Sequence, residues 1–172
     1  MIIWIIGLSG SGKSTIAQAV YEQWKAADPA TVLADGDHIR AVMGNNTEET
    51  YTLEGRAQNS LRMAGLCRWL DSQDINVICP VLSIFSAHRQ ELRKQTGRYF
   101  EVYVQRPLER VVEDDSKGLY RAFREGRTRH VVGMDIPFPE PETPDMVVAN
   151  EPFVDVSQTA RSILQACGAF AA

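Results

Sequence analysis

The chain has 172 residues, of which 44% are hydrophobic, and this predicts one domain over residues 1–172 with a buried core. Its 18 Lys and Arg residues against 22 Asp and Glu residues give a net charge of −4, so no overall basic field attracts nucleic acid or an anionic membrane. No apolar run is long enough for a membrane span, and the first residues show no basic leader. We therefore expect a cytoplasmic protein with neither a nucleic-acid partner nor a membrane partner.

Short apolar runs alternate along the chain with segments of helical periodicity. Five runs are candidate strands, at residues 2–6, 31–34, 75–82, 100–104 and 146–148. This alternation predicts an α/β fold in which right-handed crossovers build a parallel sheet, with ligands bound outside the carboxyl ends of the strands. Pro80 cannot donate a hydrogen bond to a neighbouring strand, which predicts that the third strand ends or kinks there.

A glycine-rich loop directly follows the first candidate strand and precedes a helical segment. Residues 7–14 read GLSGSGKS, a phosphate-binding loop in which backbone N–H groups and the helix N-terminus bind phosphate oxygens. Lys13 is expected to reach the β- and γ-phosphates of ATP, and Ser14 is expected to bind Mg²⁺ through its hydroxyl. The residues predicted to bind the nucleotide are Gly7, Ser9, Gly10, Ser11, Gly12, Lys13, Ser14 and Thr15.

Two aspartates, Asp35 and Asp37, follow the second candidate strand. Because the carboxyl ends of parallel strands lie at the same edge of the sheet, we expect these carboxylates to face the phosphate loop. One could hold Mg²⁺ through water and the other could accept the proton of an attacking hydroxyl. An Asp-Gly turn with a capping aspartate is the alternative interpretation.

A helix is predicted to begin near Gly55. At about 100° per residue, Arg56 and Asn59 share a face with the apolar Met63 and Cys67. Polar residues at the open end of an apolar stripe indicate the floor of a polar pocket. A buried structural ion pair is the alternative.

A basic segment at residues 117–130, KGLYRAFREGRTRH, holds five of the chain's 18 Lys and Arg residues. Such a local excess favours a mobile lid, at about residues 117–133, that closes over phosphates, with Gly118, Gly126 and Gly133 as hinges. An ordinary exposed basic helix is the alternative.

These motifs together resemble the adenylylsulfate kinases. The resemblance rests on GLSGSGKST at residues 7–15, DGDHIR at 35–40, the R-x-x-N-x-x-R pattern at 56–62 and KGLY at 117–120. It implies a P-loop kinase-type three-layer sandwich with a mainly parallel five-stranded sheet and a basic lid. It also implies transfer of the γ-phosphoryl group of ATP, with Mg²⁺, to the ribose 3′-hydroxyl of a small-molecule nucleotide acceptor, and a homodimeric assembly.

Individual residues take predicted roles from this resemblance. Lys13, Asp37 and Ser83 are the predicted catalytic residues, where Ser83 is either a phosphoryl acceptor or a ligand-binding hydroxyl. Ser14 and Asp35 are the predicted metal ligands. The predicted substrate-binding residues are Asp35, Asp37, Arg40, Tyr51, Arg56, Asn59, Ser83, Lys117 and Leu119.

The chain departs from the family pattern around the acceptor. Ser86 stands where FISPYR has its arginine, Val131 replaces an aromatic residue that would stack on the base opposite Tyr51, and Asp114 replaces an arginine on the donor side. Losing one stacking partner costs about 1–3 kcal/mol. Adenosine 5′-phosphosulfate is the default acceptor, and cytidine diphosphoramidate, used in decorating capsular polysaccharide, is the alternative. A non-catalytic nucleotide-sensing module is a third hypothesis, against which the intact Lys13 and Asp37 argue.

Overall fold

A parallel sheet of five strands forms the centre of the computed structural model, which describes residues 1–44 and 47–170. The strands are β1 (Ile2–Ile6), β2 (Thr31–Leu33), β3 (Asn76–Val81), β4 (Tyr99–Gln105) and β5 (Met146–Ala149), and they lie in the order β2-β3-β1-β4-β5. All four pairings between neighbours are parallel. The predicted α/β fold with a parallel five-stranded sheet is confirmed.

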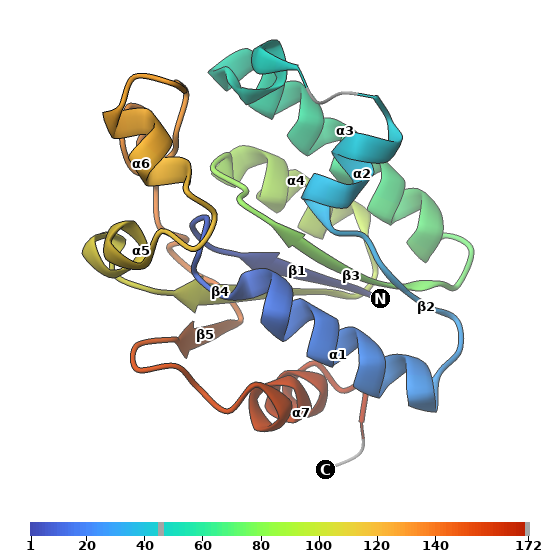
Figure 1. Ribbon diagram of the computed structural model, residues 1–172. Coiled ribbons are helices and arrows are strands. Elements are labelled where there is room, and N and C mark those ends of the chain that lie inside the picture. Colours follow the sequence, from blue (N-terminus) through green and yellow to red (C-terminus); the bar gives the residue numbers. More distant parts are fainter. Residues whose placement is uncertain (45–46, 171–172) are drawn as a thin grey trace.

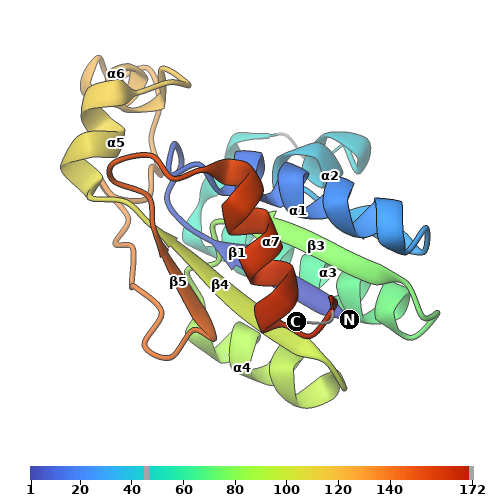
Figure 2. The same ribbon diagram turned by 90° about the horizontal axis from the view of Figure 1, so that it is seen from below.

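Helices cover both faces of the sheet, which confirms the predicted three layers (Figures 1 and 2). The helices are α1 (Lys13–Ala27), α2 (Gly36–Val42), the 3-10 helix η1 (Glu48–Tyr51), α3 (Leu53–Asp71), α4 (Ser86–Gln95), α5 (Leu108–Asp114), α6 (Leu119–Arg124) and α7 (Val156–Ala166). Helices α1 and α7 pack together on one face, and α3 and α4 pack together on the other. No helix in the described ranges is both long and apolar enough to cross a membrane.

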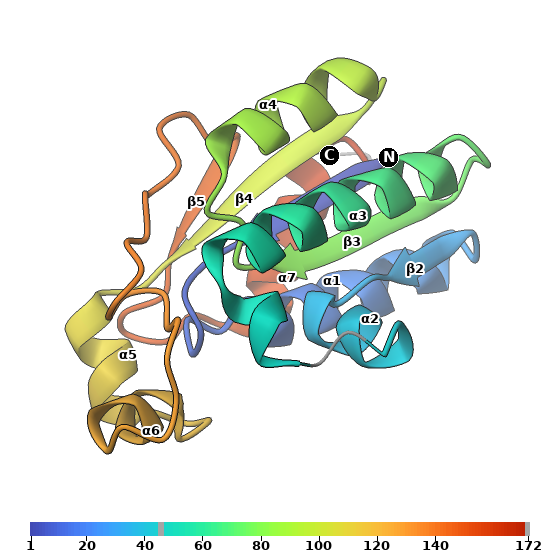
Figure 3. The ribbon, with the colours of Figure 1, turned by 90° about the horizontal axis from the view of Figure 1, so that it is seen from above.

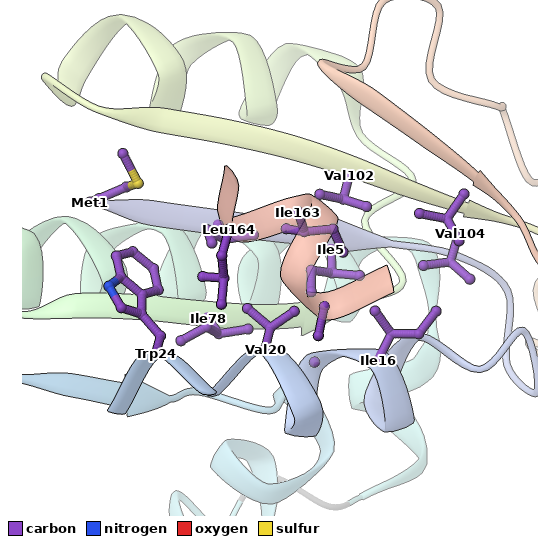
Figure 4. Packing of buried hydrophobic residues seen from close by; sticks show 14 residues of the cluster. Met1, Ile5, Ile16, Val20, Trp24, Ile78, Val102, Val104, Ile163 and Leu164 are labelled. Carbon is purple, nitrogen blue, oxygen red and sulfur yellow. The ribbon is translucent and has the colours of Figure 1, made fainter. Parts of the chain in front are cut away.

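Strand β1 contributes side chains to the apolar cores on both faces of the sheet, because its side chains alternate between the two faces. Ile3 and Ile5 pack with residues of α1 and α7 (Figure 4). Ile2, Trp4 and Ile6 pack on the opposite face, in the cluster that includes residues of α3. Burial on both faces explains why the run Ile2–Ile6 is apolar throughout rather than alternating.

Pro80 lies inside β3, opposite Ile5 of β1, so the prediction that the strand ends or kinks at this proline is wrong. The N–H of Asn76 and the carbonyl of Ile78 both bond toward β2, whereas the N–H of Val77 bonds toward β1. By this alternation the nitrogen of Pro80 also faces the β2 side. Because β2 ends at Leu33, opposite Ile78, the missing N–H costs no hydrogen bond between strands.

The carboxyl ends of the strands meet the phosphate loop and the basic segment, with α5 and α6 beyond the end of the sheet (Figure 3). Only residues 119–124 of the basic segment are helical, and the chain continues as a loop to residue 133 and beyond. A third apolar cluster lies under this region and includes Leu8, Val111, Tyr120 and Val131. Gly118, Gly126 and Gly133 all have positive φ angles, of 67°, 70° and 93°, which favour glycine.

Candidate active site

A cavity of about 590 Å³ opens at the carboxyl ends of the strands. Its walls come from the phosphate loop, α2, α3, the loop between β3 and α4, and the basic segment. Every residue predicted to bind the acceptor lines this cavity. Ser9, Lys13 and Ser14 line it as well, whereas the other residues predicted to bind ATP, namely Gly7, Gly10, Ser11, Gly12 and Thr15, do not.

The phosphate loop has a fixed backbone. Gly12, which caps α1, has a φ of 92°, and a Cβ atom added to it would lie 2.5 Å from Asn150 Nδ2. The Asn150 side chain donates a 2.8 Å hydrogen bond to the carbonyl of Ser11 and accepts one of 3.1 Å from the N–H of Val154. Sequence analysis missed Asn150, and its only signal there is a polar residue directly after the last candidate strand.

Lys13 extends from the first turn of α1 along the loop. Its ammonium donates a 3.1 Å hydrogen bond to the carbonyl of Leu8. Burial, together with the positive charge of Lys117, lowers the pKa of Lys13 to about 8 and outweighs the opposing effect of Asp37 and Asp35. Among the described residues the ammonium forms no salt bridge, and a phosphate oxygen would supply an anionic partner.

Ser14 and Asp35 bring oxygen ligands together across the cavity. The Ser14 hydroxyl donates a 3.0 Å hydrogen bond to Asp35 Oδ2. Asp35 Oδ1 accepts a bond of 2.9 Å from the N–H of Asp37 and so caps α2. Asp35 therefore does act as the capping residue of the alternative interpretation, while its second oxygen still reaches Ser14.

A hydroxyl and a carboxylate oxygen fit Mg²⁺, which binds few protein ligands and keeps several waters. The described part of the chain contains no group of three or more His, Cys, Asp or Glu residues that could form a complete metal cage. The chemistry of Ser14 and Asp35 thus agrees with a metal held partly by nucleotide phosphates.

Asp37 lies at the mouth of the cavity between two cations. Its carboxylate forms salt bridges with Arg40 and, at 3.2 Å, with the Lys117 ammonium of the basic segment. Partial burial raises the pKa of Asp37, but Arg40, Lys117 and Lys13 together lower it more, so that the net shift is downward. The carboxylate is therefore held ionised and still largely accessible.

The start of α3 and the basic segment are joined by Arg56. Its guanidinium donates 2.8 Å hydrogen bonds to the carbonyls of Tyr51 and His130. The Tyr51 ring lies 5.5 Å from the guanidinium carbons of both Arg40 and Arg56. Arg56 thus bonds to backbone carbonyls rather than to a carboxylate, so the alternative of a buried ion pair does not describe it.

Ser83 follows β3 and has a left-handed backbone conformation, with φ of 50°. Its hydroxyl accepts a 3.0 Å hydrogen bond from the indole N–H of Trp4. Arg89 donates a 2.7 Å bond to the Ser83 carbonyl and forms a buried salt bridge of 3.4 Å with Glu101. These contacts hold Ser83 at the cavity wall with its hydroxyl proton available to a ligand.

The basic segment is attached to the rest of the site at two further points. The Tyr120 hydroxyl donates a 3.0 Å bond to the carbonyl of Ser9 in the phosphate loop. The Asp135 carboxylate accepts bonds of 2.8 and 2.6 Å from the N–H groups of His130 and Val131. Neither role was predicted, although both residues belong to stretches that match the family pattern. Five consecutive residues of this segment also line the cavity, namely Arg127, Thr128, Arg129, His130 and Val131.

Asp114, the unusual residue on the donor side, pairs with Arg106. The same guanidinium forms a 3.0 Å salt bridge with Glu151 and lies 4.3 Å from the centre of the exposed Phe153 ring. Arg106 also donates a 3.4 Å bond to the Gly10 carbonyl in the phosphate loop. Sequence analysis missed this residue, which carries no motif signal of its own.

The family model described as Adenylylsulphate kinase matches residues 1–149. The chain belongs to the adenylylsulphate kinase family. As a member of this family it is an ATP-dependent kinase, a phosphotransferase that acts on an alcohol group.

Individual family members are similar to the chain over most of its length. The chain is 36% identical to the cytidine diphosphoramidate kinase of Campylobacter jejuni over 149 residues, which cover 87% of this chain and 85% of the relative. It is 38% identical to the adenylyl-sulfate kinase of Clostridium kluyveri over 150 residues, covering 87% of this chain and 74% of the relative.

The fold agrees with a solved structure of the family. The Mycobacterium tuberculosis APS kinase, in complex with AMPPNP and APS, superposes with a TM-score of 0.85 at 28% identity, covering 97% of this chain and 96% of that one. The P-loop kinase-type fold predicted from the motifs is thereby confirmed.

Proposed function

We propose that the protein transfers the γ-phosphoryl group of ATP to the ribose 3′-hydroxyl of a nucleotide that carries a second group on its 5′-phosphate. One arrangement carries this proposal: Asp37 lies within salt-bridge distance of Lys117, in a cavity that Lys13 and Ser14 of the phosphate loop also line. A donor phosphate and an acceptor hydroxyl would thus meet between the loop and Asp37.

In the proposed reaction the oxygen of the 3′-hydroxyl forms a bond to the γ-phosphorus, and the bond from that phosphorus to the bridging oxygen of ADP breaks. Asp37 orients the hydroxyl and accepts its proton. Lys13 and the loop N–H groups hold the donor phosphates in line, and Lys117 adds positive charge where the equatorial oxygens become more negative. Bound Mg²⁺, held at Ser14 and Asp35, would supply Lewis-acid neutralisation of the donor phosphates.

The base of the acceptor is proposed to stack on Tyr51. Adenosine 5′-phosphosulfate is the first acceptor to test, because relatives named adenylyl-sulfate kinase match over most of the chain. Cytidine diphosphoramidate is the second, and one observation favours it. Val131, at the place of the second aromatic, is 2% exposed and packs in the apolar cluster under the basic segment, so it supplies no ring to stack on a large purine.

The experiment is a product assay with ATP, Mg²⁺ and each acceptor separately, in which mass spectrometry detects the phosphorylated nucleotide and kcat/KM is compared. Transfer to the 3′-position of either acceptor supports the proposal. ATP binding without transfer to either acceptor would contradict it and support the nucleotide-sensing hypothesis.

Lys13→Ala is the matched negative variant. Removing a positive charge that stabilises the transition state lowers kcat by about 10²–10³. The fold is retained because, within the described residues, the ammonium donates to one backbone carbonyl of the phosphate loop. Lys94→Ala, an exposed lysine of α4, controls for loss of a positive charge. Full activity in Lys13→Ala would remove Lys13 from the donor site.

A further inference from the structure

One end of the cavity is formed by side chains for which the motifs give no role. Ser60 of α3 and Phe85 of the loop between β3 and α4 both line the cavity there. His88 of α4 is half-buried behind Ser60: its Nδ1 lies 3.1 Å from Ser60 Oγ, and its ring centre lies 5.0 Å from that of Phe85. A polar pair therefore occupies an otherwise apolar wall.

The placement of this pair suits the far end of an acceptor. In the proposed function, which this inference rests on, the 3′-hydroxyl lies at Asp37 and the base at Tyr51. Ser60 lies one helical turn beyond Arg56, deeper between α3 and α4. The remaining arm of the nucleotide, on its 5′ side, extends to this end of the cavity.

Two arginines near this end are already bonded within the protein. Arg56, one helical turn before Ser60 on α3, donates to the carbonyls of Tyr51 and His130. Arg89 of α4 is buried and is bonded to Glu101 and the Ser83 carbonyl. Within the described residues, neither arginine thus offers an unpaired charge beside Ser60.

The other side chains here, Met63, Ile84 and Phe85, are apolar. An anionic oxygen placed against a hydroxyl that can only accept a hydrogen bond is unfavourable. A terminal N–H, which can donate to that hydroxyl, is better accommodated.

The hydrogen bond to His88 determines what Ser60 can offer. When the Nδ1 lone pair accepts the Ser60 proton, the lone pairs of Ser60 Oγ remain available to accept a hydrogen bond from a ligand N–H. His88 thus acts through Ser60 and is a positioning residue.

We propose that Ser60, oriented by His88, recognises the terminal group on the 5′ side of the acceptor and selects a group that bears N–H over one that bears only oxygen. A phosphoramide has this chemistry, whereas a phosphate or a sulfate does not.

The test compares two acceptors that differ only at the terminal group, cytidine diphosphoramidate and cytidine 5′-diphosphate, with ATP, Mg²⁺ and detection of product by mass spectrometry. The wild-type protein should have the higher kcat/KM for the phosphoramidate. Ser60→Ala should reduce this preference by about tenfold, through KM rather than kcat, because one hydrogen bond is lost. An unchanged preference, or an equal loss with both acceptors, would overturn the proposal.

Variants of His88 distinguish a role in orienting the Ser60 hydroxyl from a role in packing alone. His88→Leu should reduce the preference as Ser60→Ala does, and His88→Asn should restore it by placing an amide oxygen near the position of Nδ1. Gln90→Ala, at an exposed residue of the same helix, should change nothing. A His88→Leu variant that retains the full preference would remove His88 from this role.

The proposed function and this inference fail in different ways. If the protein phosphorylates adenosine 5′-phosphosulfate and prefers the diphosphate of the cytidine pair, the proposed function holds and this inference is wrong. If it phosphorylates none of the three, the proposed function fails and the inference fails with it.

Discussion

Asp37 has the most charged neighbours of the carboxylates at the site. Arg40, Lys117 and Lys13 all lower its pKa against the effect of burial. A carboxylate with a lowered pKa is a weak base, so in the proposed reaction the main contribution of Asp37 is to orient the hydroxyl and to accept the proton late in the transfer.

We expect Asp37→Asn to lower kcat by about 10²–10⁴ while the Kd for ATP changes little. Steady-state kinetics and calorimetric titration with ATP measure the two effects separately. Asp74→Asn, at an exposed aspartate with φ of 59°, is the matched control and should be as active as the wild type. An unchanged kcat in Asp37→Asn would exclude Asp37 from the chemistry.

The lowered pKa of Lys13 predicts that ATP binding depends on pH. Because its pKa is lowered to about 8, the ammonium is charged below that pH and loses its proton as the pH rises through it. ATP affinity should therefore decrease above about pH 8, and binding there should be accompanied by proton uptake. Titration calorimetry in two buffers of different ionisation enthalpy measures this uptake. Lys13→Ala should abolish it, and uptake that persists in this variant would assign it to another group.

At the scale of elements, a buried side chain of α6 attaches the basic segment to the phosphate loop. Tyr120 is 1% exposed, and its hydroxyl donates to the Ser9 carbonyl. This bond joins a segment that lines the cavity to the loop that is proposed to hold the donor.

Tyr120→Phe should lower the free energy of unfolding by about 1 kcal/mol and raise the KM for ATP, because the Ser9 carbonyl loses its partner. Chemical denaturation and ATP kinetics are the measurements. Tyr21→Phe, on α1 and far from the loop, controls for loss of a tyrosine hydroxyl. If both variants raise the KM equally, the link between the segment and the loop carries no specific function.

The sequence predicted the elements better than it predicted the contacts between them. The strands were found at the correct places because buried apolar runs are distinctive, as at Ile2–Ile6. The end of β3 was predicted wrongly at Pro80, since only the register shows that the proline nitrogen faces the side where β2 has already ended. Asn150 and Arg106 were missed because each acts on residues more than 90 positions away, a relation that only the fold reveals.

At the scale of the whole molecule, the three cysteines report on the integrity of the core. Cys67 of α3 and Cys79 of β3 are fully buried in the same cluster, whereas Cys167, after α7, is half-buried. Burial, together with the neighbouring Cys67, raises the pKa of the Cys79 thiol, which disfavours the reactive thiolate.

A thiol reagent at about pH 8 should therefore modify only Cys167 in the native protein, and the other two only on global unfolding. Mass spectrometry of the modified protein with time measures this. ATP should slow the modification of Cys67 and Cys79 by stabilising the native state. Rapid labelling of these two cysteines under native conditions would mean that the layer of α3 opens on its own.

The central position of β1 has a consequence for synthesis on the ribosome. This strand precedes both of its partners, β3 and β4, in the sequence, so one of its edges stays unpaired until about residue 81 has emerged and the other until about residue 105. The phosphate loop gains its supporting hydrogen bond later still, because the side chain that bonds to its Ser11 carbonyl is that of Asn150. The nucleotide-binding motif is thus translated well before the residue that completes the support of its loop.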